Sequence, residues 1–372
     1  MIDDAIKKLI DSSHLPYFVK PTNDGRLAFY VDNHMITTHN RCERKFYLQH
    51  ILNLRPKGVG GFAMSIGGWW SSVLEDFYNR IKLAQSTEVT KHIHDPQVPY
   101  FSRQTIANAP YPTREAFIED AAKRWREAKM DLLADARPKM YKEFGGTSGA
   151  ALMAMSYYDT QGRADAQQWR IVEAEAGFGQ RGEVLLHEDK DIICYYTGKP
   201  DLIAFTNGGK DLMPIEHKTI HRVVNGIQNK YKPFSQVAGY IYSVNTIAKS
   251  LGYDKPVDRA IVNITGRAMP AEKPRDGVKK SRFTRVFPTY TVDELEEWKQ
   301  NVVAKTKRLH YSLINNEWIW KESECHLYAG CEYRGIDSRP PGVRPLVVAS
   351  DYVQVEAWTP YVIEDEDDDI GY

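Results

Sequence analysis

Asp201, Glu216 and Lys218 have the side-chain types and the spacing that hydrolysis of a phosphodiester bond requires. Two carboxylates that share a site are stable together when a cation neutralises them. Carboxylate oxygens suit Mg²⁺ or Mn²⁺, and such an ion can hold a phosphate and lower the pKa of a bound water. Lys218 would orient that water or stabilise negative charge. The same pattern also fits a strand edge with an ordinary salt bridge, so the triplet alone does not decide.

The segment between Trp169 and Thr219 has the composition of a strand meander that would position these residues. It contains three β-rich runs, WRIVEAEAGF, IICYYTGKPDLIAF and LMPIEHKTI, separated by polar turns that include Asn207-Gly208-Gly209. Side chains alternate along a strand, so Glu216 and Lys218 share one face. Asp201, in the preceding predicted strand, converges with them if that turn pairs the two strands.

Helical periodicity surrounds this meander. The spacing predicts a helix over Thr38–Leu52 with Asn40 as its cap, and a second helix after Gly67 and Gly68 with Ser71 and Glu75 on neighbouring turns. Further predicted helices are listed here by range: a helical insertion within 84–165, Pro233–Leu251, and Val292–Leu313. A strand is expected through AIVNIT, between the last two helices.

The composition bounds the class of protein. The chain has 372 residues, 42% of them apolar, which is enough for a large core. No apolar run could span a bilayer and the N-terminus lacks a secretory signal, so we expect a cytoplasmic protein without a membrane partner. Formal net charge is zero, but Glu364–Asp369 is an acidic run. Without those six acids, 43 acidic residues face 49 basic ones, a surplus compatible with nucleic acid. The tail itself is either a solvated end or a DNA-mimicking or partner-binding segment.

Several segments, in order along the chain, resemble the RecB-like, CRISPR-adaptation-nuclease-like branch of the PD-(D/E)xK nucleases of phages and bacteria. They are NRCERKFYLQHILNL, GGWWSSVLEDFY, TGKPDLIAF, MPIEHKT and FSQVAGYIY. These are similar to that branch's cysteine-containing helix, G-x-x-x-H-x-x-x-E helix, G-x-x-D strand, (D/E)-x-K strand and Q-x-x-x-Y helix. The resemblance covers most of the chain and implies a restriction-endonuclease-like α/β fold, a mixed sheet flanked by helices with a helical insertion.

The resemblance also implies roles for individual residues. Asp201, Glu216 and the main-chain carbonyl of His217 would bind Mg²⁺ or Mn²⁺, with Lys218 catalytic. Gln236 and Tyr240 would contact DNA or support the site. The family's metal-binding histidine falls on Ser71, a poorer ligand than imidazole, so the metal is bound more weakly, or Glu75 compensates, or the enzyme is degenerate.

The cysteines are too few for a disulfide scaffold. SECHLYAGCEYRGIDSR resembles the branch's C-terminal cysteine segment, in which a [4Fe-4S] cluster is held. Cys42, Cys325 and Cys331 match, whereas Asp337 stands at the last cysteine position. An alternative spacing places Glu322 at the missing position. The segment either holds a cluster or zinc ion, or is a vestigial staple of buried thiols.

A basic loop follows the AIVNIT strand. Lys279, Lys280 and Arg282 lie in it beside Phe283, as expected either for a groove that contacts the DNA backbone or for a solvated or site-supporting loop.

We therefore expect a single nuclease domain over residues 1–372. Its predicted parts are 37–82 with the two N-terminal helices, 84–165 with the insertion, 169–251 with the catalytic sheet and Q-x-x-x-Y helix, 320–362 with the cysteine segment, and 363–372 with the acidic tail. The favoured function is a DNA exonuclease or endonuclease in recombination, repair or phage DNA metabolism, with a helicase or recombinase as a partner. The alternatives are a weakened nuclease fold that serves as a DNA- or protein-binding subunit, and a cluster-binding module without nuclease activity.

Overall fold

The computed structural model describes residues 15–57, 62–92, 113–136, 138–174, 184–224, 226–233, 235–268, 281–326 and 330–356. The chain divides into two compact units, which we call unit 1 (residues 1–59, 177–198 and 293–372) and unit 2 (residues 60–176 and 199–292). The acidic tail, Lys279 and Lys280 lie outside the described residues. That the whole chain works as one nuclease domain stays a prediction.

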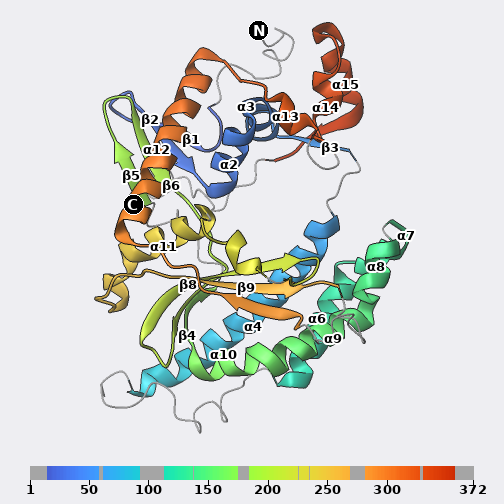
Figure 1. Cartoon of the computed structure of the whole chain (residues 1–372), viewed down its shortest axis with the longest axis vertical. Helices are drawn as coiled ribbons and strands as arrows, with labels where there is room; N and C mark the ends of the chain where they lie inside the picture. Colours follow the sequence, from blue (N-terminus) through green and yellow to red (C-terminus); the bar gives the residue numbers. More distant parts are fainter. Residues whose placement is uncertain are drawn as a thin grey trace, which may run out of the picture. The chain divides into compact units, whose positions relative to one another are not determined.

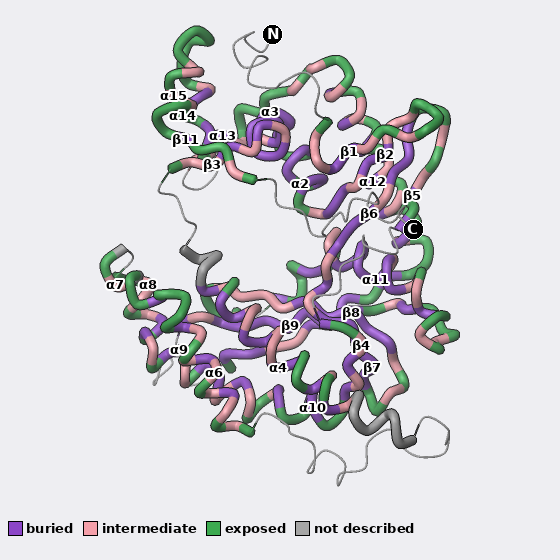
Figure 2. The backbone as a smooth tube through the Cα atoms, turned by 180° about the vertical axis from the view of Figure 1, so that it is seen from behind, coloured by how far each residue is buried: buried purple, intermediate pink, exposed green. Residues whose placement is uncertain are grey.

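Unit 2 is built on a five-stranded mixed sheet (Figure 1). Its strands, in spatial order, are β10 (Phe283–Val286), β9 (Ile261–Gly266), β8 (Asp211–Ile220), β7 (Leu202–Thr206) and β4 (Arg170–Ala174). β8 and β9 run parallel, and the other neighbours are antiparallel. β7 and β9 are buried along their whole length (Figure 2), and the polar Asn263 and Thr265 of β9 are therefore buried as well.

Helices cover both faces of this sheet, with α4 (Phe62–His92) on one face and α11 (Ser235–Ile247) on the other (Figure 1). The predicted apolar stripe of α4 is buried in the main core of unit 2. Two helices of the predicted insertion, α6 (Arg114–Glu127) and α9 (Gly146–Tyr157), pack in that same core through Phe117, Trp125 and Tyr157. The described part of the insertion is therefore an integral layer of unit 2.

Short helical elements complete unit 2. They are η2 (Met130–Leu132), α7 (Leu133–Ala136), α8 (Pro138–Phe144), η3 (Tyr158–Gly162), α10 (Arg163–Gln168), η4 (Ile227–Lys230) and η5 (Lys249–Leu251).

Unit 1 contains a four-stranded sheet in the order β1 (Val19–Pro21), β2 (Leu27–Val31), β6 (Ile192–Tyr196) and β5 (Val184–Glu188). The long helix α12 (Val292–Asn315) packs on it, with Trp298 edge-on to Tyr196 and the Cys194 thiol 3.4 Å from the Thr306 hydroxyl. Cys194 is thus a core residue. The remaining elements are α2 (Asn33–Arg41), α3 (Glu43–Phe46), η1 (Tyr47–Ile51), β3 (Leu54–Pro56), α13 (Glu322–Cys325), α14 (Arg334–Asp337), η6 (Pro341–Val343), α15 (Arg344–Asp351) and β11 (Tyr352–Gln354). β3 and β11 form a two-stranded sheet.

The single helix expected over Thr38–Leu52 is wrong, because the chain breaks at Cys42. Cys42 is extended (φ −160°, ψ 110°) and its sulfur accepts a hydrogen bond from the Lys45 N–H at 3.4 Å, so it ends α2 and caps α3. The cap of α2 is Asp32, whose carboxylate accepts from the Met35 N–H at 2.7 Å, and the expected cap Asn40 lies inside the helix.

Two other boundaries also differ from expectation. α4 begins five residues before Gly67, not after the glycine pair. The run IICYYTGKPDLIAF is not one strand, because β6 joins the sheet of unit 1 whereas β7 joins that of unit 2. Pairing with residues distant in sequence, such as Phe29 with Cys194, separates the two halves of this run.

The predicted α/β class, with mixed sheets flanked by helices, is confirmed. Among the residues that the structure describes, no helix is long and apolar enough to cross a membrane.

Candidate active site

The turn at Asn207-Gly208-Gly209 joins β7 to β8 as an antiparallel hairpin. All three turn residues have positive φ, a conformation that Asn and Gly adopt at least cost. The register pairs Leu202 with Ile215, so one further step along it places Asp201 opposite Glu216. Asp201 stands directly before β7 rather than inside a strand as expected. Local turn chemistry thus brings together two carboxylates that are 15 residues apart in sequence.

Asp201 and Glu216 are both held in place by hydrogen bonds. The Asp201 carboxylate accepts a hydrogen bond from the His217 N–H at 2.5 Å. Glu216 is 5% exposed, and its Oε1 accepts from the Lys218 ammonium and, at 3.0 Å, from the Gln236 amide. A buried carboxylate requires such compensation. The backbone and side-chain donors fix where both acids point.

The Lys218 ammonium donates to Glu216 and is near enough to Asp201 to be influenced by its charge. Burial lowers the pKa of its ammonium, but Glu216 and Asp201 outweigh burial, and the net shift is upward. Lys218 is therefore protonated near neutral pH. Both acids act on this one group, so all three side chains form a single electrostatic cluster.

α11 completes the cluster through residues four apart on one helical face. Gln236 accepts from Lys218 Nζ at 3.0 Å and donates to the Tyr240 hydroxyl at 2.8 Å. That hydroxyl donates to the Lys199 carbonyl at 3.1 Å. Gln236 is thus fixed between Lys218 and Glu216, and Tyr240 ties it to the segment that leads into Asp201.

His217 faces the opposite side of β8, because strand side chains alternate. Its ring stacks on Tyr78 of α4 at 5.6 Å, and its Nδ1 lies 3.2 Å from the Asn263 amide nitrogen. Burial lowers the pKa of His217 to about 3, so the imidazole is neutral. His217 contributes to the site through its backbone N–H, and its carbonyl stays a predicted metal ligand.

Ser71 and Glu75 lie on α4, the helix that packs on the His217 side of the sheet. Both are half-buried. The structure places their helix against β4 and β8. Their roles as metal ligands stay predictions. Glu173 on β4 pairs with Lys82 at 2.6 Å and is about half exposed, as an ordinary surface acid would be.

The donor chemistry of the cluster fits a hard divalent cation. Asp201 and Glu216 offer carboxylate oxygens, and His217 offers a carbonyl, which is the donor type that Mg²⁺ and Mn²⁺ prefer. Within the described part of the chain, no group of three or more His, Cys, Asp and Glu side chains is arranged as a metal site. A cation held here would rest on two carboxylates, with backbone oxygen and water completing its coordination.

A buried polar network behind β8 was not anticipated from the sequence. Asp165, 1% exposed at its side chain, accepts from Arg285 at 2.5 Å and from the Tyr78 hydroxyl at 2.7 Å. Tyr157 contacts both Tyr78 and Asn263, the neighbour of His217. Tyr231 was also missed, although it lies close enough to Lys218 for the ammonium to affect its pKa. These residues are scattered in sequence, so no local motif marks them.

Arg282 is buried, and its guanidinium donates to the carbonyls of Gly266 and Arg267 at 2.7 Å. Burial lowers its pKa to about 10. This placement favours the supporting role over DNA contact. Lys279 and Lys280 lie outside the described residues, so their predicted DNA contacts stay predictions.

Cys42, Cys325 and Cys331, the cysteines predicted to hold the cluster, all belong to unit 1, where the Cys331 N–H donates to the Cys325 carbonyl at 3.2 Å. Burial raises the pKa of the Cys331 thiol, and Cys325 and Cys42 raise it further, so the three sulfurs are within electrostatic range. Asp337 does not fit as a fourth ligand as placed, because Arg44 engages its carboxylate at 3.1 Å in a largely buried ion pair. The iron–sulfur cluster stays a prediction.

The model of the PD-(D/E)XK nuclease superfamily matches residues 35–336 of this chain. The chain belongs to the PD-(D/E)XK nuclease superfamily. Proteins of this superfamily are typically nucleases, and the matched region contains Asp201, Glu216 and Lys218 as well as Cys42, Cys325 and Cys331. No curated protein matches the chain.

Proposed function

We propose that this protein is a metal-dependent deoxyribonuclease, with Asp201, Glu216 and Lys218 at its active centre. The observation that carries the proposal is that both carboxylates act on one half-buried lysine, Lys218, whose ammonium Gln236 holds in place. An ordinary salt bridge between strand residues would not need a residue from a helix, Gln236 of α11, to hold the Lys218 ammonium. The superfamily assignment supports the same conclusion.

Each residue has a defined task in this proposal. Asp201, Glu216 and the His217 carbonyl would hold Mg²⁺ or Mn²⁺, which supplies Lewis-acid activation of the phosphate and of a water. Lys218, protonated, would orient the water or stabilise the negative charge that develops on the phosphate. Gln236, supported by Tyr240, would hold the Lys218 ammonium next to the Glu216 carboxylate.

The finer assignment is an exonuclease of the RecB-like branch, acting in recombination, repair or phage DNA metabolism. The motif order along the chain supports it. A helicase or recombinase is the expected protein partner, and the cytoplasm of a bacterium or an infected host is the expected setting.

One observation favours a second candidate, a weakened nuclease fold that serves as a DNA-binding subunit. Ser71 occupies the position where the family pattern has a histidine, and a hydroxyl is a poorer metal ligand than imidazole. The intact Asp201–Glu216–Lys218 cluster with Gln236 outweighs this one departure.

The test is cleavage of end-labelled linear single- and double-stranded DNA beside closed circles, with Mg²⁺, Mn²⁺ or chelator. We expect metal-dependent cleavage of linear DNA by the wild type and none by Glu216→Gln. Sparing of circles would establish an exonuclease, and cleavage of circles an endonuclease. A folded protein that binds DNA and cleaves none of these substrates would support the structural subunit instead.

A further inference from the structure

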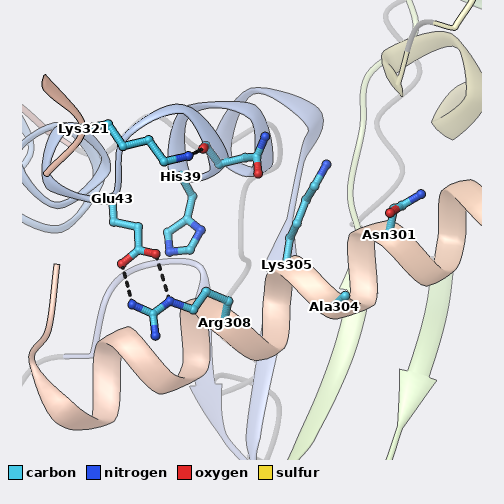
Figure 3. Close-up of a pocket in the computed structure, with 8 residues that line it drawn as sticks. His39, Glu43, Asn301, Ala304, Lys305, Arg308 and Lys321 are labelled. Atoms are coloured by element: carbon cyan, nitrogen blue, oxygen red, sulfur yellow. Dashed lines mark hydrogen bonds and ion pairs between the residues drawn. The ribbon is translucent and has the colours of Figure 1, made fainter. Parts of the chain in front are cut away.

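Unit 1 contains a cavity of about 240 Å³, formed by α2, α3, α12 and the segment after α12. Its lining residues come from three stretches of sequence: His39, Asn40, Glu43, Asn301, Ala304, Lys305, Arg308 and Lys321 (Figure 3). All of them belong to unit 1, whereas the Asp201–Glu216–Lys218 cluster belongs to unit 2. The cavity is therefore a separate feature of the protein.

The lining of the cavity is positively charged. Lys305, Arg308 and Lys321 face a single acid, Glu43. Arg308 neutralises this acid through two hydrogen bonds of 2.9 and 3.1 Å, which Figure 3 shows as dashed lines. Two positive charges remain.

These two remaining lysines differ in how they are held. Lys305 is half-buried on α12, and burial alone lowers its pKa, without a carboxylate in the described structure to offset the cost. Lys321 is placed by a hydrogen bond to the Asn40 carbonyl. The site therefore holds a half-buried ammonium that an anion would stabilise.

His39 supplies a second, independent sign of a ligand. It is 2% exposed, and its Nε2 is buried without a hydrogen-bond partner among the described residues. Figure 3 shows the ring pointing from α2 toward Glu43 and Arg308. A buried polar atom without a partner is costly, so this nitrogen is expected to meet a ligand or water. Burial lowers the pKa of His39 to about 4, so the neutral ring can donate one hydrogen bond to an oxygen.

We propose that this cavity binds a terminal phosphate group, the dianion common to inorganic phosphate and to the phosphorylated end of a DNA strand. The charge argument favours a terminal group, because a phosphate monoester carries about −1.5 to −2 near pH 7 whereas an internal diester carries one negative charge. The net lining charge of two matches the monoester. The volume is also below the roughly 300–1,000 Å³ of pockets for larger organic ligands.

The binding of inorganic phosphate stands on unit 1 alone, and only the DNA arm rests on the proposed nuclease function. The two are separable. Phosphate binding without DNA cleavage would leave this inference intact and remove the proposed function. DNA cleavage without phosphate binding would remove this inference and leave the proposed function intact.

The experiment is calorimetric titration of the full-length protein with inorganic phosphate, with ³¹P NMR line broadening as a second readout. The DNA arm uses short oligonucleotides with a 5′-phosphate, a 3′-phosphate or hydroxyl ends, in the Lys218→Ala background to prevent cleavage. Lys305→Ala should weaken phosphate binding about tenfold, which corresponds to about 1.4 kcal/mol. Lys307→Ala is the matched control, because Lys307 is on the same helix but pairs with Asp189 outside the cavity.

Ala304 offers a variant pair that does not remove any packing. Its side chain is exposed on α12 at the cavity wall, so both Glu and Gln are compatible with the helix. Ala304→Glu should abolish phosphate binding, whereas Ala304→Gln, with nearly the same volume, should retain most of it. The difference between these two variants separates the effect of the added negative charge from the effect of the added side-chain volume.

The inference is overturned if the wild type does not bind phosphate at millimolar concentration, or if Lys305→Ala and Ala304→Glu bind it as the wild type does. Equal binding of phosphorylated and hydroxyl-ended oligonucleotides would overturn the DNA-end assignment. Tighter binding of one phosphorylated end, lost in Ala304→Glu, is the result we expect.

Discussion

Arg285→Met is the substitution whose effect the structure defines most fully. Arg285 donates to Asp165 at 2.5 Å, and its guanidinium lies over the Trp169 ring at 4.7 Å. Methionine keeps the apolar stem and removes the charge. The substitution leaves the buried Asp165 carboxylate with the Tyr78 hydroxyl at 2.7 Å but without its cation.

The expected cost is about 3–5 kcal/mol of unfolding free energy, which is typical when one partner of a buried ion pair is removed. Asp165 is 1% exposed at its side chain and Arg285 is 20% exposed, so solvent cannot replace the lost partner. Burial already raises the pKa of Asp165, and loss of Arg285 raises it further. Protonation then relieves the buried charge, so the cost should shrink as the pH is lowered.

Urea unfolding followed by circular dichroism measures this cost, and hydrogen exchange of the β8–β10 peptides locates it in unit 2. Arg114→Met is the matched control, because Arg114 pairs with Asp159 in the same unit with both side chains more than a third exposed. An exposed pair of this kind contributes about 0–1 kcal/mol. If Arg285→Met costs no more than Arg114→Met, the buried network does not stabilise the sheet of unit 2.

Three further predictions concern the active site, acid stability and the cysteine segment. Gln236→Leu removes two hydrogen bonds that hold Lys218 and Glu216, and each contributes about 1 kcal/mol. We therefore expect the cleavage rate to fall at least about tenfold. Gln228→Leu is the control, because Gln228 is exposed. Burial lowers the pKa of His50 to about 3. Below about pH 6.5, His50 therefore binds a proton in the unfolded chain but stays neutral in the folded chain. Stability should therefore fall with acidification, and His50→Gln should make that slope shallower by up to about 1.4 kcal/mol per pH unit in urea titrations between pH 6 and 4. Arg44→Met leaves the largely buried Asp337 without its cation and should cost about 3 kcal/mol in the same assay, whereas Arg41→Met, in a more exposed pair, should cost less than about 1.

Local signals in the sequence were sufficient for the hairpin that builds the candidate site. Asn207-Gly208-Gly209 specifies the turn, strand alternation places Glu216 and Lys218 on one face, and helical spacing places Gln236 and Tyr240 on another element. Each of these rules acts over a few residues, and the structure has each feature where the rule puts it.

Pairing between strands that are far apart in the chain could not be predicted from local sequence patterns. β1 and β2 are short, and β2 pairs with residues of β6 that lie 165 positions further along the chain, so neither strand has a strong local pattern. The break at Cys42 depends on a sulfur that caps a helix, a rare function for cysteine that periodicity does not show. The network around Asp165 assembles from five separate elements, α4, α9, α10, β9 and β10, and only the fold brings its members together.

The most direct test of the central claim compares the rate of Mg²⁺-dependent cleavage of linear DNA by the wild type and by Lys218→Ala. Lys210→Ala serves as the control, since Lys210 is an exposed lysine in the turn at the other end of β8. The account predicts metal-dependent cleavage that Lys218→Ala slows by at least about 10²-fold, as expected for loss of an electrostatic group at the reaction centre, and that Lys210→Ala leaves unchanged. Cleavage by Lys218→Ala at the wild-type rate, from protein that is equally folded, would contradict it.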